Sequence, residues 1–167
     1  MLEEIGAHSL LDIPCGDFRW LSEVPLGVSY IGGDIVSALV DANNQRFGTE
    51  SRRFLQLDLT TSSLPQADVV LCRDCLVHLS FANIHQALAN IRKSGAKYLL
   101  MTNFPEIAVN LDISDGDWRP LNFELAPFHF PPPLRTIDEK CSEGDGAYRD
   151  KSLALWNILD AWPYNST

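Results

Sequence analysis

Three aspartates in the first 60 residues stand where a carboxylate could bind a polar ligand. They are Asp12, Asp34 and Asp58, which lie at or near the ends of the apolar runs 10–13, 30–35 and 53–57. A carboxylate accepts hydrogen bonds from hydroxyl and amine groups. In an open α/β sheet, ligands bind outside the carboxyl ends of the strands, at a topological switch point. The pattern therefore predicts a nucleotide-like ligand held by these carboxylates.

The turn that follows the first apolar run supports the same interpretation. Residues 14–17 read Pro-Cys-Gly-Asp, and Gly16 lets a ligand approach the backbone closely because it has no side chain. Asp34 follows 18 residues later, where a carboxylate can accept both hydroxyl hydrogens of a ribose. The GxGxxG fingerprint is absent, so a nicotinamide-dependent reductase loses its main support. The alternative for each aspartate is a solvated strand end or a helix N-cap.

Residues 72–80 (CRDCLVHLS) form the second segment whose side chains could take part in catalysis or binding. His78 is a candidate general base, since an unperturbed imidazole titrates near pH ~6.5, or else a structural hydrogen-bonding group. Asp74 is a candidate base, a helix N-cap or an arginine partner. A tetrahedral zinc site from Cys15, Cys72, Cys75 and His78 is conceivable. We expect no metal, because the turn that carries Cys15 is committed to the ligand and no second CxxC exists.

The stretch 103–133 is rich in Pro, Phe, Asn and Asp and shows little periodicity, which predicts a lid or acceptor-facing loop. Trp118 could stack on a flat substrate, Arg119 could pair with an anionic acceptor, and His129 adds a hydrogen-bonding group. These three residues are the candidate substrate-binding residues. The alternative for the phenylalanines of residues 123–130 is that they cover an open face of the sheet.

Composition limits the classes of function. The chain has 167 residues, 46% of them hydrophobic, and a formal net charge of −9. This length predicts one domain, and the acidic balance argues against a nucleic-acid partner, which needs clustered Lys and Arg. No apolar run approaches the ~20 residues of a membrane span, and the basic start of a signal peptide is absent. We therefore expect a cytoplasmic protein with no membrane partner, in which the four cysteines are thiols.

Periodicity predicts alternating strands and helices. Strands are expected over residues 10–13, 30–35, 53–57, 67–71, 98–102, 134–138 and 152–158. Helices are expected over residues 18–24, 36–47 and 83–92. The last two strands have no helix-length spacer between them, so they should pair antiparallel.

This series of features resembles the class I S-adenosylmethionine-dependent methyltransferases. The resemblance rests on DIPCGDF, GDI, CRDCLVHLS and GDWRPLN, and on the terminal hairpin. It implies a Rossmann-like three-layer α/β sandwich. Its mostly parallel seven-stranded sheet has the order 3-2-1-4-5-7-6 and ends in an antiparallel hairpin. Residues 1–167 would form a single methyltransferase core domain with the lid at 103–133.

The resemblance also implies S-adenosylmethionine as the cofactor and assigns residues to it. Asp12 and Gly16 would line its methionine end, Asp17 would partner its ammonium group, and Asp34 would accept from the ribose. The implied cofactor-binding residues are Asp12, Pro14, Gly16, Asp17, Asp34, Ile35, Asp58, Leu59, Cys72 and Arg73. Asp58 would accept from the adenine amine. The sequence departs from the family at Pro14 and Phe18, which stand where two glycines are usual.

The implied activity is methyl transfer to a small-molecule acceptor, such as an oxygen of a sugar or another metabolite. A base is needed only when the acceptor is a hydroxyl or a protonated amine, so the lack of an obvious base–nucleophile pair does not oppose this activity. The alternative is a catalytically inactive cofactor-binding or partner-binding module of the same fold. The expected elements do not include the N-terminal helical cover that family members often carry. A minimal form, a shortened chain, or self-association as a homodimer that closes the site would each account for this.

Overall fold

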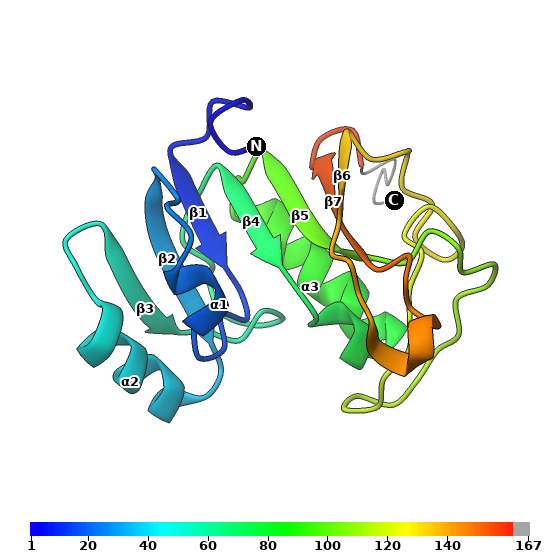
Figure 1. Cartoon of the computed structure of the whole chain (residues 1–167), viewed down its shortest axis with the longest axis horizontal. Coiled ribbons are helices and arrows are strands. Elements are labelled where there is room, and N and C mark those ends of the chain that lie inside the picture. The colour runs from blue at the N-terminus through cyan, green and yellow to red at the C-terminus, as the bar shows by residue number, and fades with distance from the viewer. Residues whose placement is uncertain (162–167) are drawn as a thin grey trace. The chain divides into compact units, whose positions relative to one another are not determined.

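The computed structural model describes residues 1–161, which form one seven-stranded sheet with the strand order β3-β2-β1-β4-β5-β7-β6. The strands are β1 (Ser9–Asp12), β2 (Ser29–Asp34), β3 (Arg52–Gln56), β4 (Val69–Cys72), β5 (Tyr98–Asn103), β6 (Arg135–Asp138) and β7 (Ser152–Asn157). β1 pairs parallel with β2 and β4, and β7 pairs antiparallel with β5 and β6. The expected order and the antiparallel hairpin at the end of the chain are confirmed (Figure 1).

Within residues 1–161, three α-helices and two 3-10 helices accompany the strands. They are α1 (Arg19–Ser22), α2 (Ser37–Phe47), η1 (Leu76–His78), α3 (Phe81–Lys93) and η2 (Glu143–Gly146). α1 is shorter than expected because Phe18 has a left-handed backbone, with φ 58°, and Pro25 disfavours helix in the residue before it. No helix among residues 1–161 is long and apolar enough to cross a membrane.

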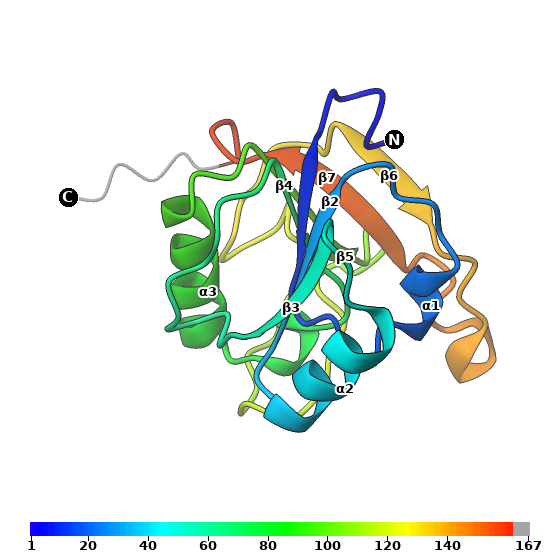
Figure 2. The same ribbon diagram turned by 90° about the vertical axis from the view of Figure 1, so that its left-hand side faces the viewer.

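Two compact units make up the chain, and each is described by itself. The first comprises Met1–Leu71 and Gln86–Lys97, and the second comprises Cys72–His85 and, among the described residues, 98–161. In the first unit β1 and β4 are almost wholly buried, as expected for central parallel strands. α2 lies beside β3 (Figure 2), and the Asn44 side chain bonds both the N–H and the carbonyl of Phe54.

Phe18 explains how the first unit tolerates a phenylalanine where the resembled family has a glycine. Its backbone keeps the positive φ that glycine would adopt, and its ring is 1% exposed. The ring centroid lies 4.8 Å from Tyr30, 5.3 Å from Phe47 and 5.2 Å from Phe54. Burial of four aromatic rings against one another offsets the strain of the left-handed residue.

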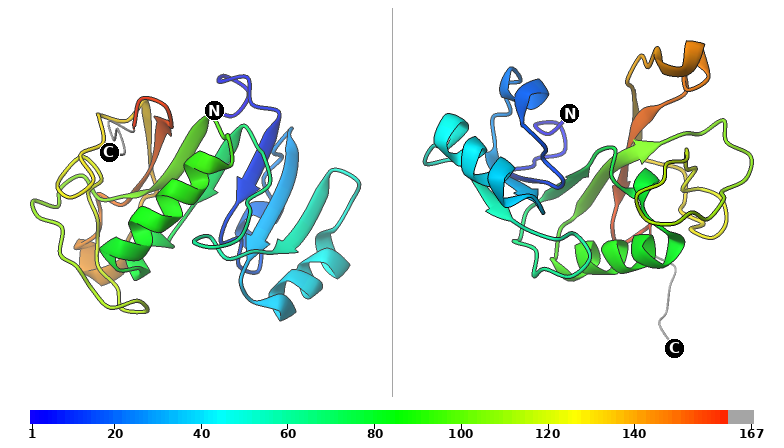
Figure 3. Two further views of the ribbon diagram at one scale, coloured as in Figure 1. Left: turned by 180° about the vertical axis from the view of Figure 1, so that it is seen from behind. Right: turned by 90° about the horizontal axis from the view of Figure 1, so that it is seen from below.

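In the second unit, residues 104–134 contain no helix or strand, as expected, and yet they are packed. Phe123 and Phe130 are buried against Trp156 of β7, while Phe128 contacts the ring of Phe81 at the start of α3. Figure 3 shows the segment itself as irregular ribbon, coloured from yellow-green to yellow. The rings therefore act as cover for the sheet, the alternative left open by the sequence.

Asparagine side chains satisfy much of the backbone in this segment. Asn110 donates to the carbonyls of Asn122 and Ala126 at 2.8 Å each, and Asn122 donates to the carbonyl of Pro105 at 3.1 Å. The Asn103 side chain accepts from the N–H of Phe123 at 2.9 Å. Buried backbone groups that lack a ladder partner are thereby paired.

Candidate functional site

The turn after β1 is held from two sides by bonds to its backbone. Cys15 N–H donates to the Gly33 carbonyl at 2.8 Å, and the Asn43 side chain of α2 donates to the Gly16 carbonyl at 2.8 Å. Gly16 has φ +54°, and a Cβ placed on it would meet nothing within 4 Å. The conformation of the turn therefore favours glycine, and there is open space beside it.

Asp34, at the end of β2, is oriented by two backbone N–H groups. Its Oδ2 accepts from Gly16 at 3.1 Å and its Oδ1 accepts from Val36 at 2.9 Å. Each carboxylate oxygen can accept two hydrogen bonds, so each retains a lone pair beyond the bond it makes here. Asp34 is 5% exposed, while the next residue, Ile35, is 62% exposed. The end of β2 thus offers an oriented carboxylate with an apolar side chain beside it.

Asp12 precedes the turn, Cys15 lies within it, and both side chains are buried. Asp12 is 1% exposed, and the Tyr30 hydroxyl donates to its Oδ2 at 2.7 Å. Burial raises the pKa of Tyr30 far above its usual value, and the charge of Asp12 adds to the effect. Burial, with smaller effects from Asp12 and Asp34, raises the pKa of the Cys15 thiol to about 12. Cys15 is therefore a protonated, unreactive thiol at neutral pH.

The remaining predicted cofactor residues of the first unit have varied surroundings. Asp58 lies two residues beyond β3 and accepts from Thr60 N–H at 2.8 Å; the bond from the Thr60 hydroxyl is the main cause of its lowered pKa. Leu59 is buried, and its carbonyl accepts from Asn90. Asp17 is exposed and forms an ion pair of 3.3 Å with Arg19. Pro14, between Ile13 and Cys15, is half-buried.

Four charged side chains form a network in the second unit, just after β4. Arg73 Nε donates to Glu139 Oε1 at 2.6 Å, and its Nη1 lies 3.4 Å from Asp74 Oδ2. Lys151 Nζ lies 2.8 Å from Asp74 Oδ2 and 3.6 Å from Glu139 Oε2. Cys72 beside them is fully buried. Asp74 thus has an arginine partner, and sequence reasoning missed Glu139 and Lys151.

His78 has one ring nitrogen committed to the backbone. Its Nδ1 lies 2.9 Å from the carbonyl oxygen of Asp117. A carbonyl oxygen only accepts hydrogen bonds, so the proton of the neutral ring belongs on Nδ1. Nε2 then carries the free lone pair, and a general base would accept a proton at this atom.

A cavity of about 230 Å³ in the second unit brings several candidates together. It is lined by Asp74, His78, Phe104, Trp118, Glu143, Tyr148 and Lys151. The ring centroids of Trp118 and Tyr148 are 4.8 Å apart at 72°, and Phe104 lies 6.1 Å from each of them. Asp74 and Phe104 follow the carboxyl ends of β4 and β5, where α/β proteins bind ligands. Three predicted residues (Asp74, His78 and Trp118) therefore share one cavity.

Arg119 and His129 have other surroundings. Arg119 is 6% exposed and donates to the carbonyls of Leu76 at 2.9 Å, Leu79 at 2.5 Å and Leu111 at 3.1 Å. Burial lowers its pKa. These bonds give the guanidinium a structural role that the sequence could not indicate. His129 is exposed with φ 52°, and neither residue lines the cavity.

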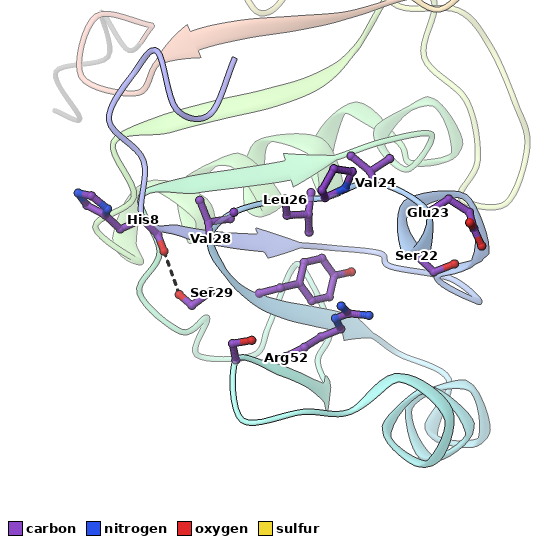
Figure 4. Close-up of a pocket in the computed structure, with 12 residues that line it drawn as sticks. His8, Ser22, Glu23, Val24, Leu26, Val28, Ser29 and Arg52 are labelled. Atoms are coloured by element: carbon purple, nitrogen blue, oxygen red, sulfur yellow. Dashed lines mark hydrogen bonds between the residues drawn. The ribbon is translucent and has the colours of Figure 1, made fainter.

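A larger cavity, of about 690 Å³, lies in the first unit (Figure 4). Its lining comprises His8, residues 22–30, Ser51 and Arg52. His8, Ser51 and Arg52 lie where β1 and β3 begin, away from the carboxyl ends at which Asp34 and the turn of Gly16 lie. The position does not match the strand ends at which α/β sheets bind ligands.

No protein-family model matches the sequence, and no curated protein matches it. Solved structures do match. The 1,6-didemethyltoxoflavin-N1-methyltransferase of Burkholderia thailandensis, with bound 1,6-didemethyltoxoflavin and S-adenosylhomocysteine, has a TM-score of 0.68 and 18% identity, over 92% of this chain and 72% of that one. A TehB-like S-adenosylmethionine-dependent methyltransferase from Corynebacterium glutamicum matches with a TM-score of 0.60 and 18% identity. The match covers 93% of this chain and 84% of that one.

Human N-acetylserotonin methyltransferase, in complex with S-adenosylmethionine, matches with a TM-score of 0.64 and 16% identity. The match covers 90% of this chain and 47% of that enzyme, so the chain spans about half of its length. These structural neighbours are class I S-adenosylmethionine-dependent methyltransferases, and the chain has their Rossmann-like fold with the 3-2-1-4-5-7-6 sheet. The expected resemblance is confirmed at the level of the fold.

Proposed function

We propose that this chain binds S-adenosylmethionine and transfers its methyl group to a small molecule. The observation that carries the proposal is the oriented Asp34 carboxylate, which keeps a lone pair on each oxygen beside the open Gly16 turn. A ribose presents two adjacent hydroxyl donors, which match those two lone pairs.

The other residues take the roles that the resemblance implies. Gly16 would let the methionine part of the cofactor approach the backbone, and Ile35 would cover the adenine with its exposed apolar side chain. Asp58 and Leu59 would lie on the adenine side. Asp12 would line the methionine end beside Gly16, and Asp17 would partner the ammonium group. Pro14 would border the turn, and Cys72 and Arg73 would supply backbone after β4. When bound, the cofactor supplies a sulfonium methyl group that an acceptor lone pair can displace.

The second unit would bind and orient the acceptor. Trp118 offers a ring surface, and His78 offers Nε2 to hold a proton that the acceptor loses. Alignment of the nucleophile and exclusion of water provide most of the rate in such a transfer. The chain needs no covalent intermediate of its own for this chemistry.

Calorimetry and a transfer assay test the proposal. S-adenosylhomocysteine should bind with a one-to-one stoichiometry, while NAD should not compete for the site. Radiolabelled methyl groups should then appear in small molecules of a cell extract. Binding without any transfer would favour the alternative, a catalytically inactive cofactor-binding module. Absence of S-adenosylhomocysteine binding would refute both.

A further inference from the structure

We propose that the cavity walled by Phe104, Trp118 and Tyr148 binds the methyl acceptor, and that this acceptor is a small amine bound as its ammonium ion. The inference names the substrate class of the proposed methyltransferase and therefore rests on that proposed function. Three aromatic walls and an excess of carboxylate in one cavity carry it.

The aromatic walls favour a cation. Trp118 and Tyr148 meet edge to face, and Phe104 meets each of them in the same way. The face of an aromatic ring attracts a cation through its quadrupole, most strongly for tryptophan and within about 6 Å of the ring centroid. Trp118 remains 40% exposed, so part of its surface is available to a ligand.

The charges around the cavity favour the same ligand. Two cations and two carboxylates neutralise one another beside the cavity. Lys151 lies 2.8 Å from Asp74 and 3.6 Å from Glu139, and Arg73 pairs with the same two carboxylates. Glu143, in η2, has no hydrogen-bond or ion-pair partner among the described residues. The cavity therefore carries one carboxylate more than its cations neutralise, which attracts a cation and repels an anion.

The volume limits the size of the acceptor. A water molecule occupies about 30 Å³ in the liquid, so 230 Å³ holds roughly eight waters. A single ring with a short amine arm fits such a space. This volume lies below the roughly 300 Å³ at which pockets for drug-sized ligands begin.

The methyl transfer balances when His78 takes the proton that the acceptor loses. An ammonium acceptor first loses a proton, which His78 Nε2 takes and later releases to water. The nitrogen lone pair then forms a bond to the methyl carbon as the carbon–sulfur bond breaks, and the electron pair of that bond stays on sulfur. The sulfonium becomes a neutral thioether, and the product is a methylated ammonium ion.

Three matched probes test the inference by calorimetry in the presence of S-adenosylhomocysteine. They are phenethylamine, 2-phenylethanol and phenylacetate, which share one ring and differ in charge. Phenethylamine should bind about tenfold more tightly than the alcohol, and phenylacetate should bind most weakly. Glu143→Gln should reduce the preference for the amine at least threefold. Asp145→Asn is the matched control, since it removes an exposed acid of the same η2 turn that does not line the cavity.

The outcomes separate this inference from the proposed function. Equal or tighter binding of the alcohol or the carboxylate overturns the amine assignment, as does a complete lack of binding by all three probes. An amine preference that survives Glu143→Gln, or that is lost equally in Asp145→Asn, overturns it too. If S-adenosylhomocysteine binds and the amine preference fails, only the acceptor class falls. If the amine binds and S-adenosylhomocysteine does not, the methyltransferase proposal falls instead.

Discussion

Replacing Asp34 with alanine should weaken the binding of S-adenosylhomocysteine by about 1.5–3 kcal/mol. This is the range for hydrogen bonds to a charged group, and it corresponds to a roughly 10- to 150-fold higher Kd. The lower part of the range applies if water enters the space left by the carboxylate and replaces one of the two ribose contacts. The Gly16 turn should persist, because the bonds from Cys15 to Gly33 and from Asn43 to Gly16 do not involve Asp34.

The same substitution should also destabilise the fold. Asp34 accepts from two backbone N–H groups, those of Gly16 and Val36, and its removal leaves both without their partner. We expect a loss of about 3 kcal/mol in the free energy of unfolding, the lower end for two such bonds. Urea unfolding measures this effect independently of the ligand.

Calorimetry with S-adenosylhomocysteine is the decisive assay, and Asp41→Ala is the control. Asp41 is an exposed carboxylate on α2, so its removal changes the net charge equally without touching the turn. Asp41→Ala should bind like the wild type. A folded Asp34→Ala protein whose Kd stays within twofold of the wild-type value would refute the ribose assignment.

Two further predictions concern stability. Asp68 has a pKa of about 2, mainly because it accepts a hydrogen bond from the His8 N–H, with Lys97 3.1 Å away. Its carboxylate therefore stabilises the fold above the unfolded pKa of about 3.9 and loses this effect as the pH falls towards 2. Asp68→Asn should lower the free energy of unfolding in urea by about 1–2 kcal/mol at pH 7 and by progressively less below pH 4. A difference between mutant and wild type that stays constant down to pH 3 would contradict this. Arg119→Lys should cost about 2–4 kcal/mol, because one ammonium cannot reach three carbonyls, and should leave the Kd for S-adenosylhomocysteine within twofold. A cost under about 0.5 kcal/mol would show that these three bonds do not hold the segment.

The sequence predicted the central strands β1, β4 and β5 well because they are short and almost wholly buried. The run 98–102 and the observed β5, Tyr98–Asn103, agree almost residue for residue. Apolar side chains on both faces produce an unbroken hydrophobic run that polar turns interrupt, and such a pattern is visible without any knowledge of distant contacts. The aspartates at the strand ends could be recognised for the same reason.

Contacts between distant residues could not be predicted in this way. Lys151 meets Asp74 across 77 positions of sequence, and no local pattern indicates such a pair. Arg119 is a similar case, because a charged residue inside an irregular stretch suggests a ligand contact. Its partners are backbone carbonyls 40 and 43 positions away at Leu79 and Leu76, which only the fold brings to it.

The asparagine bonds of residues 104–134 have a consequence for local unfolding. Asn103, Asn110 and Asn122 link backbone groups that lie 12–20 positions apart, so one end of the segment cannot open without breaking bonds at the other. The segment should therefore exchange its amide hydrogens as one cooperative unit rather than as a set of frayed loops. Irregular backbone here is compatible with slow exchange, because side-chain amides provide the cross-links that a helix or strand would otherwise provide.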